Sequence, residues 1–314
     1  MAAPRTLICG SLASDTIMVF PDRFSRHILP GETHVLSVSF QIGEMRREWG
    51  GCAGNIAYNL KALGGEPVVM ATIGGDDRAY PERFSSLGIA SDGVRAVEGT
   101  YTAQAFIITD LDDNQITAFH PGAMNHSHVN RVSDVAGIAL GIVAPDGREG
   151  MRSHAREFHA ARIPFMFDPG QGLPLFSGEE LIEMIDCAQY LAVNDYEGRM
   201  LAERTGLSIA QIAQRVDALI VTLGADGSRI HIDGRILDIP AVKPVVVMDP
   251  TGCGDAYRAG LLYGIALGWD WERTGRLASL LGSVKIGSRG GQNHTIDRER
   301  LAKRYAEHFG GSLW

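Results

Sequence analysis

The chain has few cysteines, no long apolar run and no excess of positive charge, and each absence excludes a class of protein. Its four cysteines, Cys9, Cys52, Cys187 and Cys253, are far apart and show no Cys-x-x-Cys spacing, so we expect neither a disulfide framework nor a zinc module. No stretch approaches the roughly 18 consecutive apolar residues of a membrane-spanning helix. The net charge of −8 argues against nucleic acid or an anionic membrane surface as a partner.

Targeting and catalytic motifs are missing as well. The first ten residues run directly into a strand-like segment and leave no room for a secretory signal, so we expect a cytoplasmic protein. There is no G-x-x-x-x-G-K-[ST] motif, no G-x-G-x-x-G after the first strand and no G-x-S-x-G. A P-loop kinase, a dinucleotide-dependent dehydrogenase and an α/β-hydrolase therefore lack support.

What the chain does contain is an ordinary globular mixture, with 314 residues, 45% of them apolar and 21% charged. Short apolar runs that end in Gly, Asp or Asn alternate with segments of helical periodicity, which predicts βαβ units and a mostly parallel sheet with helices on both faces. The expected strands are Thr6–Gly10, Pro67–Gly74, Ile138–Ala144, Ile163–Asp168, Tyr190–Asn194 and Ala218–Gly224. The expected helices between them are Ala53–Leu63, Arg78–Leu87, Arg148–Ala161, Glu179–Cys187 and Ile209–Val216.

The pattern changes near the C-terminus. Ser228–Ile232 and Arg235–Ile239 flank Asp233-Gly234, which predicts a β-hairpin. Helices are expected at about 255–268, about 271–288 and from about 297 onward.

Two pairs of alternating segments interrupt the βαβ order. The first pair is Asp15–Phe20 with Thr33–Phe40, and the second is Tyr101–Thr109 with Gln115–His120, joined by a turn at 112–114. Such inserted strands form either a small separate sheet that covers the main one or edge strands of the main sheet, and the pattern favours the separate sheet.

The most informative segment reads Asp249-Pro-Thr-Gly-Cys-Gly-Asp255. Gly252 and Gly254 allow a tight turn and close approach to a ligand, and a helix is expected to begin at Asp255. The amides of Gly252, Cys253 and Gly254 would then be free at a helix N-terminus, which is an anion site. Asp255 could accept a proton from a hydroxyl, so the segment offers what phosphoryl transfer to an alcohol requires, unless Asp255 is only a helix cap.

This string resembles the Asp-x-x-Gly-x-Gly-Asp signature of the ribokinase-like (PfkB) carbohydrate and nucleoside kinases. The resemblance covers nearly the whole chain and implies one ribokinase-like three-layer α/β/α domain over 1–314, with a discontinuous β lid from about 15–50 and 99–122. The family's N-terminal glycine motif is present as Gly50-Gly51 with Asn55, which offers a donor and an acceptor to vicinal hydroxyls. An Asp at the position of Asp15 binds sugar hydroxyls in the family.

The resemblance also implies an ATP site and a metal requirement. Asn194-x-x-Glu197 corresponds to the pair that organises Mg²⁺ and phosphate, with Glu197 acting indirectly, although a capping Asn and a solvated Glu would give the same pattern. Thr222-Leu-Gly224 resembles the nucleotide-phosphate loop, and the 271–288 helix with Arg289 and Gly290 is expected to wall the adenine pocket. Asp249 and Thr251 correspond to positions that hold a monovalent cation such as K⁺ in some members.

Three strings are similar, more narrowly, to bacterial adenosine kinases: 50–60, 116–124 and 249–255. The lid of such enzymes often carries a dimer contact, so a homodimer through the lid is an expectation. Gln104, Phe106, Phe119 and His120 are candidates for contact with a purine, whereas Phe106 and Phe119 could equally pack the lid onto the body.

We therefore expect transfer of the ATP γ-phosphoryl group to the 5′-hydroxyl of adenosine in purine salvage, with Asp255 as the base. Three alternatives remain open at this point: a broader nucleoside kinase for inosine or guanosine, a kinase for ribose or fructose, and a non-catalytic nucleoside-binding protein. Arg258, one turn after Asp255, could pair with that carboxylate or contact phosphate.

Overall fold

The computed structural model describes residues 3–28, 38–112 and 114–314, which form two separate β-sheets. The larger sheet has nine strands in the order β13-β12-β11-β10-β9-β8-β1-β4-β5. Its strands are β1 Arg5–Cys9, β4 Glu66–Gly74, β5 Ala90–Val97, β8 Ile138–Val143, β9 Phe165–Phe167, β10 Tyr190–Asn194, β11 Ala218–Thr222, β12 Ser228–Ile232 and β13 Arg235–Ile239. The neighbouring strands from β5 to β11 are parallel, whereas β12 and β13 pair antiparallel and form the predicted hairpin at one edge.

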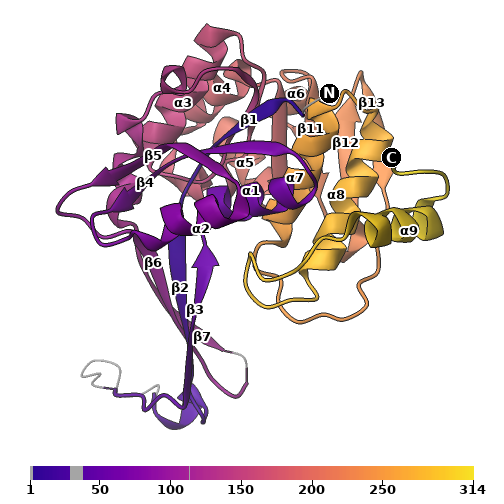
Figure 1. Ribbon diagram of the computed structural model, residues 1–314. Coiled ribbons are helices and arrows are strands. Elements are labelled where there is room, and N and C mark those ends of the chain that lie inside the picture. Colours follow the sequence, from indigo (N-terminus) through magenta and orange to yellow (C-terminus); the bar gives the residue numbers. More distant parts are fainter. Residues whose placement is uncertain (1–2, 29–37, 113) are drawn as a thin grey trace.

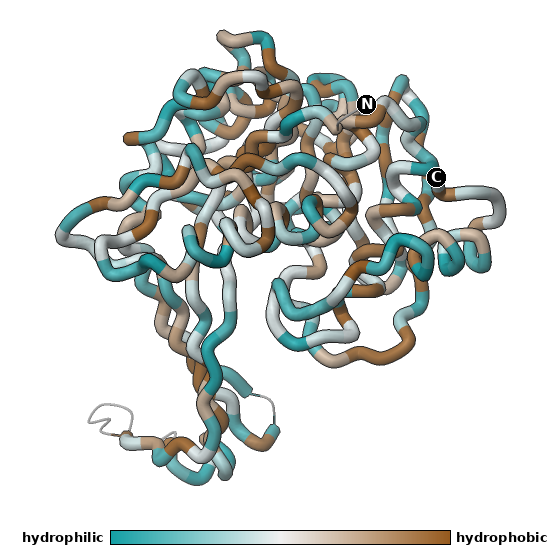
Figure 2. Tube along the Cα trace, in the orientation of Figure 1, coloured by the Kyte–Doolittle hydropathy of each residue, from teal (hydrophilic) through white to brown (hydrophobic). Residues whose placement is uncertain are grey.

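Helices cover both faces of this sheet, as Figure 1 shows. They are α1 Cys52–Ala62, α2 Ala79–Leu87, α3 Arg148–Ala161, α4 Gly178–Cys187, α5 Asp195–Thr205, α6 Ile209–Ala213, α7 Cys253–Ala266, α8 Trp271–Lys285 and α9 Arg298–Phe309. One core cluster joins the sheet to α1, α2, α7, α8 and α9, and a second joins it to α3, α4, α5 and α6. Figure 2 accordingly shows hydrophobic segments concentrated at the centre of the main body. The three-layer α/β/α prediction is confirmed.

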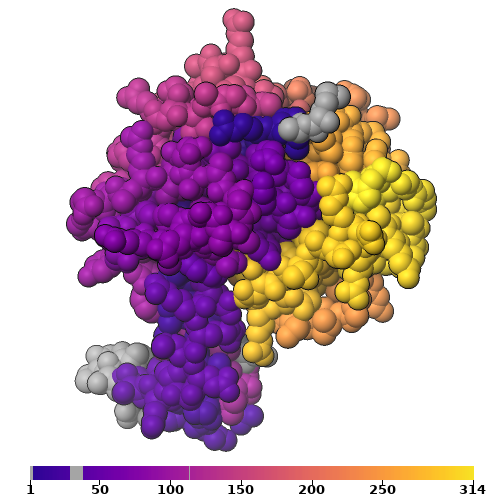
Figure 3. All heavy atoms as spheres, viewed as in Figure 1, coloured from indigo at the N-terminus to yellow at the C-terminus, as the bar shows by residue number. Residues whose placement is uncertain are grey.

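The smaller sheet, here called the lid, has the order β3-β2-β6-β7. Its strands are β2 Ala13–Val19, β3 Glu44–Gly50, β6 Ala103–Thr109 and β7 Gln115–His120. Figure 3 shows it standing out from the main body as a narrow projection. The separate-sheet prediction is therefore confirmed, and the alternative of edge strands in the main sheet is wrong.

One strand of the lid differs from the prediction. The partner of β2 is β3 at Glu44–Gly50 rather than Thr33–Phe40, whose residues 33–37 lie outside the described residues and whose residues 38–40 form no strand. Because β3 is a largely exposed edge strand, it can carry the charged sequence Glu-Met-Arg-Arg-Glu and lacks an apolar face that would reveal it. Residue 113 of the predicted turn also lies outside the described residues.

No helix in the part of the chain that the structure describes is both long and apolar enough to cross a bilayer.

Candidate active site

The predicted anion site lies at the N-terminus of α7. Gly252 is the residue before the helix and has φ of +76°, a left-handed conformation that glycine adopts without strain. The Cys253 amide donates to Pro250 O at 3.1 Å, so this amide does not face a ligand as predicted. Within the described residues, the amides of Gly252, Gly254 and Asp255 have no backbone acceptor. The amides left free at this helix start are therefore those of Gly252, Gly254 and Asp255, with Asp255 in place of the predicted Cys253.

The Asp255 side chain is held beside these amides. Asn55 Nδ2 donates to Asp255 Oδ2 at 2.8 Å, and Gln292 Nε2 in turn donates to Asn55 Oδ1 at 3.1 Å. Burial raises the pKa of Asp255 to about 6. The carboxylate is thus fixed in position and remains a usable proton acceptor near neutral pH. No motif in the sequence indicated Gln292, which is 237 residues from Asn55.

Asp15 lies on β2 of the lid, next to the glycine pair. A Cβ at Gly50 would lie 2.6 Å from Asp15 Oδ2, so a side chain there would displace this carboxylate. Gly51 has φ of +85°, and a Cβ there would lie 2.5 Å from Ser11 O. Burial, reinforced by Glu48 and Asp249, raises the pKa of Asp15 to about 6. The charge of Asp249, in the loop that precedes α7, therefore acts on Asp15 of the lid.

The four lid candidates lie on opposite faces of the lid. Asp15 pairs with Ala105, which pairs with Phe119, so Asp15 and Phe119 share a face. They are separated by two strand spacings, about 10 Å. Gln104, Phe106 and His120 belong to the alternate rows and lie on the other face. Among these candidates the structure thus brings only Phe119 onto the face of Asp15.

The Asn194–Glu197 pair forms a capping box at the start of α5. The Glu197 amide donates to Asn194 Oδ1 and the Asn194 amide donates to Glu197 Oε2, both at 2.7 Å. Burial raises the pKa of Glu197. Thr222 is in register with Asn194 on the neighbouring strand, and Gly224 follows with φ of +60°. These four residues therefore meet at the carboxyl ends of β10 and β11.

Arg258 pairs with Asp168 rather than with Asp255. Its Nε and Nη2 donate to the two carboxylate oxygens of Asp168 at 3.1 and 3.2 Å. Both side chains are buried, with 5% and 7% exposed. Asp168 directly follows β9, so this pair joins the carboxyl end of the sheet to α7.

Asp249 organises the loop that precedes α7. Its Oδ1 accepts the Thr251 amide and its Oδ2 accepts the Gly290 amide, both at 2.8 Å. Although burial opposes them, these hydrogen bonds lower the pKa of Asp249. Gly290 has φ of +69°, and the Arg289 carbonyl accepts from Asn293 Nδ2 at 3.0 Å.

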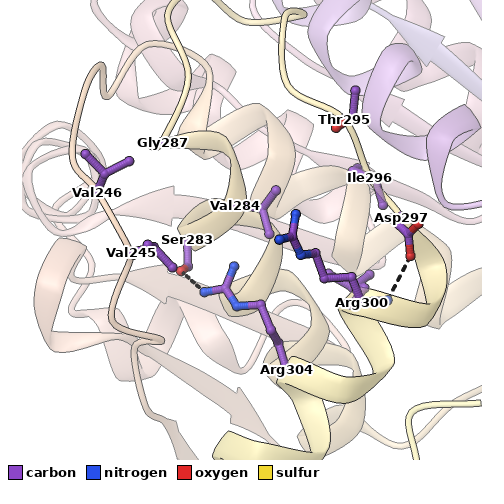
Figure 4. Close-up of a pocket in the computed structure, with 11 residues that line it drawn as sticks. Val245, Val246, Ser283, Val284, Gly287, Thr295, Ile296, Asp297, Arg300 and Arg304 are labelled. Atoms are coloured by element: carbon purple, nitrogen blue, oxygen red, sulfur yellow. Dashed lines mark hydrogen bonds between the residues drawn. The ribbon is translucent and has the colours of Figure 1, made fainter.

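A cavity of 260 Å³ lies beside this loop. It is bounded by residues 245 and 246, the last turn of α8 with Gly287, residues 295–297 and the first two turns of α9. Figure 4 shows Arg304 reaching from α9 to Ser283, to which its Nη2 donates at 3.0 Å. Arg289 and Gly290 do not line the cavity, whereas Ser283 and Val284 at the end of α8 do.

The sequence and the fold are both similar to those of known kinases. Residues 18–298 match the family model "pfkB family carbohydrate kinase". The Burkholderia thailandensis nucleoside kinase in complex with inosine is 51% identical and has a TM-score of 0.89, covering 98% of this chain and 99% of that one. A structure of that enzyme with ADP-inosine is 52% identical, with a TM-score of 0.86 and coverage of 98% and 97%. The nucleoside kinase of Methanocaldococcus jannaschii is 32% identical over 278 residues, 87% of this chain and 90% of that protein. The chain belongs to the PfkB family of carbohydrate kinases.

Proposed function

We propose that this protein transfers the γ-phosphoryl group of ATP to the 5′-hydroxyl of nucleosides that carry different bases. The observation that carries the proposal is the Asp255 carboxylate, which Asn55 holds beside three amides without a backbone acceptor. The base preference comes from the relatives, because the similar Burkholderia enzyme was solved with inosine and with ADP-inosine. This proposal replaces the expectation of a kinase that acts on adenosine alone, with adenosine kept as one of its substrates.

Each residue of the site has a separate role in the proposed reaction. Asp255 accepts the proton of the 5′-hydroxyl as this oxygen attacks the γ-phosphorus, and the leaving group is ADP. The amides of Gly252, Gly254 and Asp255 stabilise the charge on the transferred group. Asp15 and Asn55 hydrogen-bond the ribose hydroxyls, and Phe119, about 10 Å from Asp15 on the same face, stacks on the base.

We assign the adenine of ATP to the 260 Å³ cavity. Val246 and Gly287 line it, and the adjacent Met248 amide bonds to Ile286 O at 2.9 Å, so the cavity lies next to the loop that contains Asp249. The phosphates then extend past Thr222 and Gly224 toward the start of α7, with Asn194 and Glu197 beside them.

Mg²⁺ fits this site as an ion carried by the nucleotide. No group of three or more acidic, His or Cys side chains in the described ranges could hold a metal by itself. Mg²⁺ commonly binds through one or two carboxylates, water and substrate phosphates, and Glu197 with its second oxygen offers such a carboxylate. When bound, the ion would neutralise charge on the phosphates.

We further propose that the lid, within 15–50 and 99–122, closes over the nucleoside and excludes water, which limits hydrolysis of ATP. The outer face of the lid, opposite Asp15, carries exposed Met45, Phe106 and Ile116. We propose that a second copy of the chain covers this face in a homodimer.

The experiment is a comparison of adenosine, inosine, guanosine and ribose as acceptors with Mg-ATP, with products identified by mass spectrometry. We expect kcat/KM values for inosine and adenosine within roughly tenfold of each other and a value for ribose at least about 100-fold lower. A preference for ribose would support the sugar-kinase alternative, and the absence of any phosphorylated product would support a non-catalytic binding protein.

A further inference from the structure

Lys285, the last residue of α8, is a buried lysine with no exposed surface. Lysine is almost never fully buried unless its charge is paired. Its Nζ donates to Asp249 O at 2.8 Å and to Ser288 O at 2.9 Å. These partners are neutral backbone carbonyls rather than carboxylates. An ion pair therefore does not explain why Lys285 is buried.

The two carbonyls belong to the two loops that form the candidate active site. Asp249 lies in the loop that precedes α7, and Ser288 lies just before the turn whose Gly290 amide donates to Asp249 Oδ2. The Met248 and Asp249 amides bond to Ile286 O, which ties the same loops together. The Lys285 amino group therefore lies at the junction of both loops.

Lys285 also lies behind the start of α7. A Cβ at Gly282, one turn earlier on α8, would lie 3.8 Å from Cys253 O, so the two helices are close at this point. Burial lowers the pKa of Lys285, and the nearby Cys253, Asp249 and Asp255 oppose that shift. The amino group is thus within electrostatic reach of the proposed base.

This arrangement does not fit the monovalent cation expected at Asp249 and Thr251. Such a cation replaces its hydration shell with oxygens, and backbone carbonyls are its usual protein ligands. Here the Asp249 and Ser288 carbonyls already accept from Lys285, and both carboxylate oxygens of Asp249 accept amides. The Asp249 and Ser288 oxygens are therefore already occupied by donors of the chain itself.

We propose that the Lys285 ammonium group takes the place of a monovalent cation in this protein. It is a positioning residue that holds the two loops together and supplies a fixed positive charge behind the anion site, so turnover does not depend on K⁺ or Na⁺. This proposal rests on the proposed kinase function.

The first test measures the turnover of inosine by the unaltered protein at constant ionic strength in tetramethylammonium, sodium or potassium chloride. We expect rates that agree within about twofold, since the charge is covalently attached. Activation by K⁺ or Na⁺ of about fivefold or more would overturn the proposal.

The second test uses variants that separate charge from hydrogen bonding. Lys285→Gln keeps an N–H donor without charge, and we expect kcat to fall by about tenfold or more with little change in the KM for inosine. Lys285→Ala opens space, and we expect K⁺ or ammonium to restore part of its rate. The exposed Lys243→Gln is the control and should retain full activity. Wild-type turnover by Lys285→Gln, or failure of both cations to activate a folded Lys285→Ala, would refute the role of the charge.

A readout without turnover separates this proposal from the kinase function. Thermal unfolding of Lys285→Ala, followed by circular dichroism, should shift upward in potassium chloride relative to tetramethylammonium chloride, because a cation that binds only the folded state stabilises it. The unaltered protein should show no such difference. An equal response of both proteins would overturn the proposal even if the chain phosphorylated no nucleoside.

Discussion

At the scale of single residues, the buried Asp255 carboxylate lowers the free energy of unfolding at neutral pH. Its pKa is raised by burial, so its ionised form is less stable in the folded protein than in the unfolded chain. Stability is therefore lost as the pH rises from the unfolded pKa of about 3.9 through the folded value of about 6. A side chain retained at this cost is typical of a functional group.

We predict that Asp255→Asn loses at least about 1,000-fold in kcat, because it cannot accept the hydroxyl proton. The same variant should unfold at a higher temperature at pH 7.5, since the poorly solvated charge is gone. Coupled kinetics with inosine and scanning fluorimetry measure both effects, with the exposed Asp226→Asn as a control that changes neither. Near-normal turnover by Asp255→Asn would refute its role as the base.

The same carboxylate predicts a pH dependence. The ionised form accepts the proton, so kcat/KM should fall as the pH drops below about 6 and level off above it. Asp15 also has a pKa raised to about 6, so Asp15→Asn is needed to assign the decline. If the decline persists in Asp15→Asn, with KM for the nucleoside raised, it belongs to Asp255. A profile that is flat from pH 5 to 8 contradicts this assignment.

Contacts between residues that are far apart in the chain could not be predicted from the sequence. The roles predicted for Gly252, Gly254 and Asp255 follow from one short string with the geometry of a helix start. In contrast, the bond from Cys253 N to Pro250 O depends on the turn that forms there, and the Asp249–Lys285 contact joins positions 36 residues apart. No local sequence pattern predicts such contacts.

At the scale of elements, the Asp168–Arg258 pair connects the end of β9 to α7 through two hydrogen bonds. We predict that Asp168→Asn destabilises the protein by roughly 3 kcal/mol, because Arg258 is left as a buried charge without its partner. Denaturant unfolding measures the loss. The matched control is Asp186→Asn, whose partner Arg215 lies 2.7 Å away in an exposed pair and whose loss should cost no more than about 1 kcal/mol. Equal losses would contradict this account.

The elements that the sequence did not predict have a common physical reason. Strands β3 and β5 lie at the edges of their sheets, where one side is unpaired and charged or glycine residues are tolerated. Helix α5 exposes most of its surface and buries only Gly198 and Leu201, so its apolar periodicity is weak. The central strands and α1, α3 and α4 were predicted because burial requires apolar side chains at regular spacing.

At the scale of the whole molecule, the lid has two faces with different environments. The inner face carries Asp15 and Glu48, and Glu48 accepts from Asn293 of the main body at 2.5 Å. The outer face carries Met45, Phe106 and Ile116. Alternation predicted that Gln104 and Phe106 share a face, but which face looks toward the body depends on the packing of the lid as a unit.

This division predicts opposite effects for two substitutions on neighbouring strands of the lid. Phe106→Asp places a charge on the outer face and should convert the proposed homodimer to a monomer in analytical ultracentrifugation. Phe119→Asp places the same charge on the inner face and should leave the oligomeric state unchanged while raising the KM for inosine by about tenfold or more, since a stacking aromatic is lost. A monomeric unaltered protein would refute the dimer, and an unchanged KM in Phe119→Asp would refute the contact with the base. Because both changes replace an exposed phenylalanine of the lid, they test the two faces independently of lid stability.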